Sequence, residues 1–309
     1  MIQFSKMSFV LLICLVLISC KSNKKEPIEM VTVDFVNPSD SSLSEYQADS
    51  IPVLKVAVSA IISPKETYRF YSELLEYISQ KINHRIVFKQ RKTYEEVNYM
   101  LGAGEVDMAF ICSGAYIDAK KTKSIEILAQ PVCNGKTVYQ AYIIAHESSG
   151  IHDFKGFKGK TFAFTDPLSN SGKLYATKRA KDLNTTPDKF FSSSLYTYAH
   201  DKSIQLVARQ LIDGATIDGL IYEYMSKTTP ELIKNIRIIE KSEDFGIPPI
   251  VIPENLDAKL KKQLKQIVLS VHEDSIGKRI LDRLLIDKFV EGSDRDYDGI
   301  RKIMYEVAN

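Results

Sequence analysis

A segment near the middle of the chain carries the residues best suited to bind an anion. Residues 161–174 read TFAFTDPLSNSGKL, a short apolar strand, a proline turn, and then hydroxyl and amide side chains that open a helix. The first N–H groups of a helix have no partner within it, and the helix dipole places partial positive charge there. Ser169, Asn170 and Ser171 therefore predict a cradle of neutral donors for a phosphoryl-type anion. The alternative is a plain helix cap with no ligand.

Two further side chains that suit anion recognition, His200 and Asp218, follow later in the chain. A histidine can donate to an oxyanion, and it gains charge as the pH falls through ~6.5. An aspartate beside an anion repels it unless the ligand brings a P–OH or an ammonium donor, so we expect Asp218 to select among anions. Taken singly, residues of these types are more often a surface histidine and an aspartate at a turn.

Motifs typical of enzymes and metal sites are missing from the sequence. Ser171, His200 and Asp218 can be written as a catalytic triad, but there is no Gly-x-Ser-x-Gly elbow. There is no Walker A loop, and the five histidines lack the i, i+4 pairing of zinc sites on helices. We therefore expect a binding protein with no catalytic residue, cofactor or metal ion.

The N-terminus predicts export and attachment to a membrane. Lys6 precedes an apolar run whose last residues, LISC, end at Cys20 in the form that a lipoprotein signal peptidase recognises. The run is well short of the ~20 residues that span a bilayer, which disfavours the alternative of an anchor helix. We expect residues 1–19 to be a signal peptide, Cys20 to carry lipid, and residues 20–50 to form a flexible tether on the extracytoplasmic side of the cell envelope.

The composition of the chain is that of an ordinary globular protein. Apolar residues make up 44% and charged residues 26%, and the formal net charge of +2 lacks the basic excess of a nucleic-acid-binding protein. After the leader is removed and Cys20 is acylated, Cys112 and Cys133 remain. They are either two buried thiols or, in an oxidising compartment, a disulfide.

Short apolar strands alternate with helices from residue 53 onward. We expect strands at 53–61, 85–89, 105–112, 125–131, 139–146, 161–164 and 219–222, and helices at 65–82, 94–101, 172–183, 203–212, 257–272 and 277–285. Such alternation predicts an α/β fold, and strands that are apolar on both faces indicate parallel pairing. The last helices would return to cap the first half of the fold.

Several stretches together resemble one known group, the phosphate/phosphite/phosphonate-binding family of ABC-transporter substrate-binding lipoproteins. They are ISPKET at 62–67, TYEEVN at 93–98, VDMAFICSGAY at 106–116, FAFTDPLSNSG at 162–172, His200-Asp201, DGATID at 213–218 and GIPP at 246–249. The resemblance extends over residues 54–303.

The resemblance implies the type II periplasmic-binding-protein fold, in which two α/β lobes with mixed sheets flanked by helices are joined by two hinge crossings. The first lobe would comprise residues 51–146 plus 243–309, and the second lobe residues 147–242. The crossings would lie near 140–146 and 241–246.

The resemblance also implies which residues bind the ligand. They are Ser169, Asn170, Ser171, His200 and Asp218 from the second lobe, and Tyr94, Ser113 and Tyr68 from the first. Asn170 departs from the family's Ser-Thr-Ser cradle, because an amide replaces the middle hydroxyl.

The function expected from the resemblance is capture of a small oxyanion of the phosphonate, phosphite or phosphate type for an ABC permease. The protein would act as a monomer held to the membrane by lipid on Cys20. Two alternatives remain, a ligand-sensing lipoprotein coupled to a membrane kinase and a binder of another small solute on the same fold.

Overall fold

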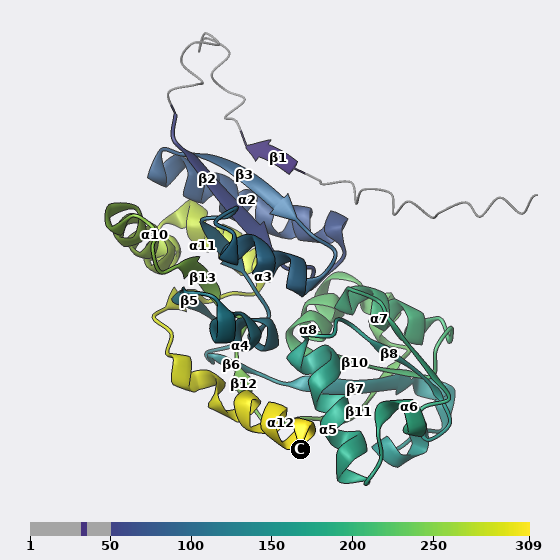
Figure 1. The fold of residues 1–309 in the computed structure, drawn as a ribbon. Helices are drawn as coiled ribbons and strands as arrows, with labels where there is room; N and C mark the ends of the chain where they lie inside the picture. Colours follow the sequence, from purple (N-terminus) through teal and green to yellow (C-terminus); the bar gives the residue numbers. More distant parts are fainter. Residues whose placement is uncertain (1–31, 36–50) are drawn as a thin grey trace, which may run out of the picture.

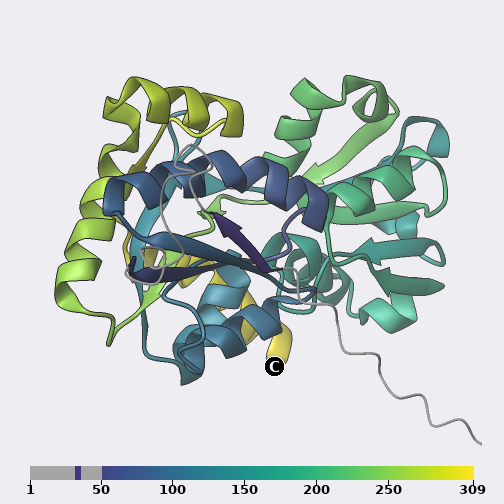
Figure 2. The same cartoon turned by 90° about the horizontal axis from the view of Figure 1, so that it is seen from above.

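The computed structural model describes residues 32–35 and 51–309, and its elements are built around two β-sheets (Figures 1 and 2). The larger sheet contains β1 (Thr32–Phe35), β2 (Val53–Val58), β3 (Arg85–Gln90), β4 (Met108–Phe110), β5 (Ile125–Val132), β13 (Ile250–Pro253) and β14 (Lys288–Val290), in the spatial order β1-β3-β2-β4-β13-β5-β14. The smaller sheet contains β7 (Ala141–His146), β8 (Thr161–Phe164), β9 (Ser193–Tyr196), β10 (Gly214–Asp218) and β11 (Ile236–Lys241), in the order β11-β7-β10-β8-β9. We call the elements around the larger sheet the first lobe and those around the smaller sheet the second lobe.

Both sheets are mixed. In the first lobe β2 pairs in parallel with β3 and β4, whereas β13 pairs antiparallel with β4 and β5. In the second lobe β8 is parallel to β9 and β10, whereas β7 is antiparallel to β10 and β11. The predicted α/β class with mixed sheets is confirmed.

Helices flank each sheet (Figure 1). The first lobe has α2 (Pro64–Ile82), α3 (Tyr94–Gly102), α4 (Ser113–Thr122), α10 (Ala258–Ser270) and α11 (Ser275–Leu284). The second lobe has α5 (Tyr175–Asp182), α6 (Pro187–Phe190), α7 (His200–Ala208), α8 (Gly219–Thr228) and α9 (Pro230–Ile233). The helix α2 buries one face, because Leu74, Leu75 and Ile78, at spacings of one, three and four, are buried against the first lobe's core. None of the helices in the described ranges has the length and apolarity needed to cross a bilayer.

The C-terminal helices take two different places. The helices α10 and α11 contact α2, so the tail does return to the first lobe as expected. The last helix, α12 (Asp298–Ala308), instead contacts α5 of the second lobe as well as α4 of the first (Figure 1). It therefore connects the two lobes rather than capping only one of them.

The expected strand at 139–146 is interrupted at Gln140. The preceding strand β6 (Val138–Tyr139) pairs with β12 (Phe245–Gly246), whereas β7 belongs to the second lobe's sheet. Ser242 joins the outgoing and returning segments, because its hydroxyl accepts from the N–H of Ala141 at 2.8 Å and its carbonyl accepts from Gln140 Nε2 at 2.7 Å. We therefore propose that the lobes divide near residues 140 and 242, which moves β7 out of the first lobe, where the family resemblance had implied it.

One expected strand, at 219–222, is wrong. The strand is β10, which ends at Asp218, and the apolar residues after it begin α8. The carboxylate of Asp218 accepts from the N–H of Leu220 at 2.8 Å, and this cap starts the helix where a strand was expected. A second difference concerns the start of a helix. The helix expected at 203–212 begins at His200 instead.

The N-terminal predictions fall mainly outside the described residues. The signal peptide, Cys20 and most of the tether lie there. The exception is β1, within the expected tether, which pairs antiparallel with β3 along the register Thr32 with Lys89 to Phe35 with Ile86. Strand β3 would otherwise leave one backbone edge unpaired, so an added edge strand satisfies those N–H and C=O groups.

Candidate functional site

The predicted cradle lies where the second lobe contacts the first. Ser169, Asn170 and Ser171 are fully buried, and a π-helical turn over Asn170–Leu174 leads into α5. The hydroxyl oxygen of Ser169 accepts from the N–H of Gly172 at 2.9 Å, so Ser169 is a helix cap. The hydroxyl of Ser171 has no hydrogen-bond partner within the described structure. Ser169 therefore caps the helix, and the hydroxyl of Ser171 is left available to a ligand.

The amide of Asn170 connects the cradle to a tyrosine at the crossing between the lobes. Its Nδ2 lies 3.1 Å from the hydroxyl of Tyr139, while its Oδ1 is buried with no partner among the described atoms. A tyrosine hydroxyl both donates and accepts, so the opposite amide orientation keeps this hydrogen bond. That orientation turns the NH₂ group outward as a donor, which is the role that the sequence predicts for this position.

His200 is positioned as a neutral donor. Its Nδ1 accepts from the backbone N–H of Asp218 at 2.9 Å, which places the ring proton on Nε2. Nε2 is buried and has no partner in the part of the chain that the structure describes. Burial lowers the pKa of His200 from 6.5 to about 3. The expectation that His200 gains charge near pH 6.5 is therefore wrong, because the desolvated ring stays neutral at physiological pH.

Asp218 is the titratable group of the site. The residue is only 2% exposed. This burial raises the pKa of its carboxyl from 3.8 to about 7. The hydrogen bond from the N–H of Leu220 opposes this shift without cancelling it. The carboxyl therefore keeps a protonated form up to near-neutral pH, and this O–H form is a donor.

The three candidates from the first lobe have different positions. Tyr94 is fully buried, and its hydroxyl has no partner among the described residues. The hydroxyl of Ser113 donates to the carbonyl of Gly246 at 2.6 Å, so it fixes α4 to the returning crossing. Tyr68 does not join the site, because it is 41% exposed and its ring lies 6.5 Å from that of Phe88 on the first lobe.

Two polar residues of this region were missed by the sequence reasoning. Tyr139 holds Asn170, as described above. Ser59 follows the carboxyl end of β2, and its buried hydroxyl has no partner within the described residues. Ligands of open α/β sheets bind outside the carboxyl ends of the strands, and this rule would have pointed to Ser59.

The lobes are closed on each other around the cradle. Backbone and side-chain bonds cross between them, from His200 N–H to the carbonyl of Ile61 at 2.9 Å and from Ser63 N–H to Asp201 Oδ1 at 2.9 Å. A third bond runs from Tyr94 N–H to Asp166 Oδ2 at 3.1 Å. These contacts bring the orphaned Tyr94 hydroxyl of the first lobe to the same interface as the cradle of the second.

A glycine lies at a close approach of the two lobes. A Cβ atom added to Gly114, in the first turn of α4, would lie 2.3 Å from the carbonyl oxygen of Leu168 and 2.9 Å from the amide nitrogen of Asn170. Both are backbone atoms of the second lobe, so neither can rotate away. Only glycine at this position permits the closed arrangement.

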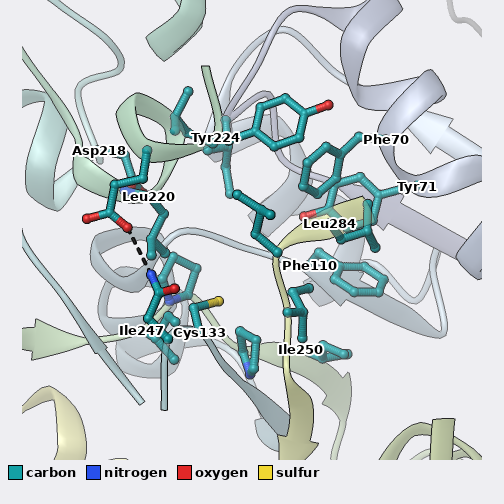
Figure 3. Close-up of a pocket in the computed structure, with 18 of the residues that line it drawn as sticks. Phe70, Tyr71, Phe110, Cys133, Asp218, Leu220, Tyr224, Ile247, Ile250 and Leu284 are labelled. Carbon is teal, nitrogen blue, oxygen red and sulfur yellow. Dashed lines mark hydrogen bonds between the residues drawn. The ribbon is translucent and has the colours of Figure 1, made fainter. Parts of the chain in front are cut away.

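A cavity of about 380 Å³ lies beside the cradle (Figure 3). Asp218 lines it, whereas Ser169, Asn170, Ser171, His200, Tyr94 and Ser113 do not.

The two cysteines of the described residues are not bonded to each other. Cys133 lines the cavity and Cys112 is buried elsewhere, and both are free thiols. The disulfide alternative is therefore wrong. Among the described residues, no three His, Cys, Asp or Glu side chains are grouped to hold a metal ion.

Two lobes with mixed sheets, joined by paired crossings and lining a common cavity, are the architecture of type II periplasmic binding proteins. Within that class, the chain belongs to the family of periplasmic substrate-binding proteins of phosphonate ABC transporters, whose family model matches residues 56–297. This confirms the resemblance seen in the sequence.

Individual relatives agree with the family assignment. The phosphate-import protein PhnD of Mycolicibacterium smegmatis is 26% identical over 256 residues, covering 75% of this chain and 79% of the relative. The phosphonates-binding periplasmic protein of Escherichia coli K12 is 24% identical over 204 residues, covering 64% of this chain and 60% of the relative.

Solved structures show the same fold. The binding protein component of an ABC phosphonate transporter from Pseudomonas aeruginosa has a TM-score of 0.78 at 24% identity, covering 84% of this chain and 87% of that one. PhnD1 from Prochlorococcus marinus, in complex with methylphosphonate, has a TM-score of 0.76 at 17% identity, covering 83% of this chain and 98% of that one.

Proposed function

We propose that the chain binds the oxyanion of a phosphonate, or of phosphite or phosphate, between Tyr94 of the first lobe and Asn170, Ser171 and His200 of the second. One observation carries the proposal, the buried polar atoms of these four residues that have no partner within the described structure. A buried polar group left without a partner costs about 1–3 kcal/mol. A phosphonate offers several oxygens to neutral donors and would satisfy them together.

The chemistry of this site suits capture without reaction. Ser171, His200 and Tyr94 present O–H and N–H groups, and burial holds the pKa of Tyr94 well above its usual range, so its hydroxyl keeps its proton. Neutral donors fixed by the fold stabilise an anion without forming a covalent bond to it. We infer binding followed by release when the lobes open by hinge motion, with no chemical step.

We further propose that the protein is an exported lipoprotein, acylated on Cys20, that acts as a monomer and delivers its ligand to a membrane permease. The family assignment supports import over sensing, since it describes transporter components. The proposed ligand is supported by the site residues, and the proposed permease partner is supported by the family assignment. The names of the relatives, which mention phosphate and phosphonates, support this class of ligand.

The cradle is tested by Ser171→Ala. We expect the fold to persist and the Kd for methylphosphonate, measured by calorimetry, to rise about tenfold, because one hydrogen bond to a charged acceptor is lost. The matched control is Ser194→Ala, at an exposed serine of β9, and it should bind like the original protein. Equal affinity of Ser171→Ala and the control would remove Ser171 from the cradle.

The titration of Asp218 predicts a pH dependence. Burial raises its pKa to about 7, so below that pH the neutral carboxyl can donate to an anion, and above it the carboxylate repels one. Relative to Asp218→Asn, which cannot ionise, the original protein should lose up to about tenfold in affinity for methylphosphonate between pH 6 and pH 8. The ligand's own ionisation is common to both proteins. A ratio of the two Kd values that stays constant with pH would contradict the assigned role.

A further inference from the structure

We propose that the cavity beside the cradle receives the carbon substituent of the ligand, so that the preferred ligand is an organophosphonate whose apolar group is much larger than methyl. This inference rests on the proposed anion cradle and adds to it the chemical class of the substituent. It assigns a role to a space that the anion-binding residues leave unexplained.

The lining of the cavity is largely apolar and comes from both lobes (Figure 3). The residues that argue for an apolar occupant are Phe70, Tyr71, Phe110, Leu220, Ile250 and Leu284. In Figure 3 the side chains of Phe70, Tyr71 and Phe110 from the first lobe lie together, and Leu220 from the second lobe lies near Asp218. An apolar group placed among them would be removed from water on several sides at once.

The size of the cavity sets it apart from a packing defect. Its volume of about 380 Å³ falls in the range of roughly 300–1,000 Å³ that small-molecule sites occupy. Protein interiors have few voids larger than a water molecule, because side chains interdigitate. The cavity also lies between the lobes, so opening the lobes would give a ligand access to it.

Asp218 connects the cavity to the cradle. Its backbone N–H donates to Nδ1 of His200, whose Nε2 is one of the cradle donors, while Asp218 itself lines the cavity. The two regions are therefore separated by the width of one residue. A phosphonate held by His200 would direct its P–C bond past Asp218 into the apolar space.

One of the three charged residues that line the cavity, Glu223, already has polar partners. The carboxylate of Glu223 accepts from the hydroxyl of Tyr142 at 3.0 Å and from Nδ2 of Asn134 at 3.1 Å. These bonds hold Glu223 among polar partners of its own. An occupant would therefore meet the aromatic and aliphatic side chains together with Asp218 and Lys227.

Calorimetry with two ligands, methylphosphonate and n-hexylphosphonate, tests the inference. Each fully buried methylene strengthens binding about fourfold, so even incomplete burial of the hexyl chain should give the original protein at least about tenfold higher affinity for hexylphosphonate. Cys133→Phe adds a ring to the cavity wall and should abolish the preference for hexylphosphonate over methylphosphonate. Cys133→Ser changes little in volume and should retain it.

Each outcome separates the two proposals. If methylphosphonate binds and hexylphosphonate binds no better, the inference is overturned and the cradle stands. If neither ligand binds, both fall. If Cys133→Phe folds and still prefers hexylphosphonate, the hexyl group binds outside this cavity and the inference is overturned. Should Cys133→Phe fail to fold, Leu220→Trp fills the cavity from a half-buried position of the second lobe and must likewise lose the preference.

Discussion

Replacing Gly114 with alanine is expected to weaken the binding of methylphosphonate about 100-fold while both lobes remain folded. The added methyl group would lie 2.3 Å from the carbonyl oxygen of Leu168, a backbone atom that cannot move without separating the lobes. Separation breaks at least the three hydrogen bonds near the cradle that cross between the lobes, each worth about 1 kcal/mol. A loss of about 3 kcal/mol corresponds to roughly 100-fold in Kd. Alanine also has a higher helix propensity than glycine, so α4 itself should not suffer.

The matched control for this prediction is Gly299→Ala. Gly299 lies in α12, and a Cβ atom added there meets nothing within 4 Å. Calorimetry should give this control the affinity of the original protein. Small-angle scattering should show contraction on adding ligand for the control and none for Gly114→Ala. Contraction of both variants, with equal affinities, would contradict the role of Gly114 in closure.

The second large effect is expected at His200, where each ring nitrogen has a separate task. Nδ1 accepts from Asp218 N–H, and Nε2 is the donor assigned to the anion. In His200→Asn the amide oxygen can replace Nδ1 as acceptor, but no group reaches the position of Nε2. Losing a donor to a charged group costs about 1.5–3 kcal/mol, or roughly 10-fold to roughly 150-fold in Kd, and the upper part of this range is expected at a fully buried ring.

His200→Gln provides the complementary variant. Its amide nitrogen approaches the position of Nε2, so part of the affinity should return although the acceptor for Asp218 N–H is lost. Calorimetry should therefore rank the original protein first, His200→Gln second and His200→Asn last. The reverse order of the two variants would show that His200 acts by holding Asp218 instead of by donating to the anion.

Local sequence was sufficient to predict most of the elements and to single out the residues that we propose for the cradle. Ser169 to Ser171 stand out because hydroxyl and amide residues at a helix start have a local physical meaning, and Leu74, Leu75 and Ile78 mark the buried face of α2 by their spacing. Asp218 also has a local role as a helix cap, but that role was not recognised, and α8 was therefore mistaken for a strand. The error shows that a short apolar run does not by itself distinguish a strand from a helix.

The parts that escaped prediction depend on contacts between the lobes. Tyr68 and Tyr71 occur at helical spacing on α2, yet only Tyr71 lines the cavity. Their periodicity is the same, and what separates them is their position along the helix relative to the second lobe. Tyr139 was missed because the break at Gln140 is held by Ser242, a residue of the returning segment. The neutral state of His200 likewise follows from burial that no local pattern encodes.

The most direct measurement of the central claim is a crystal structure of the protein with methylphosphonate. We expect one phosphonate between the lobes, with its oxygens at hydrogen-bond distances of about 2.5–3.2 Å from Ser171 Oγ, His200 Nε2 and Tyr94 OH. Its methyl group should point past Asp218 toward the cavity. A phosphonate bound elsewhere, with water molecules on those three atoms, would contradict the account.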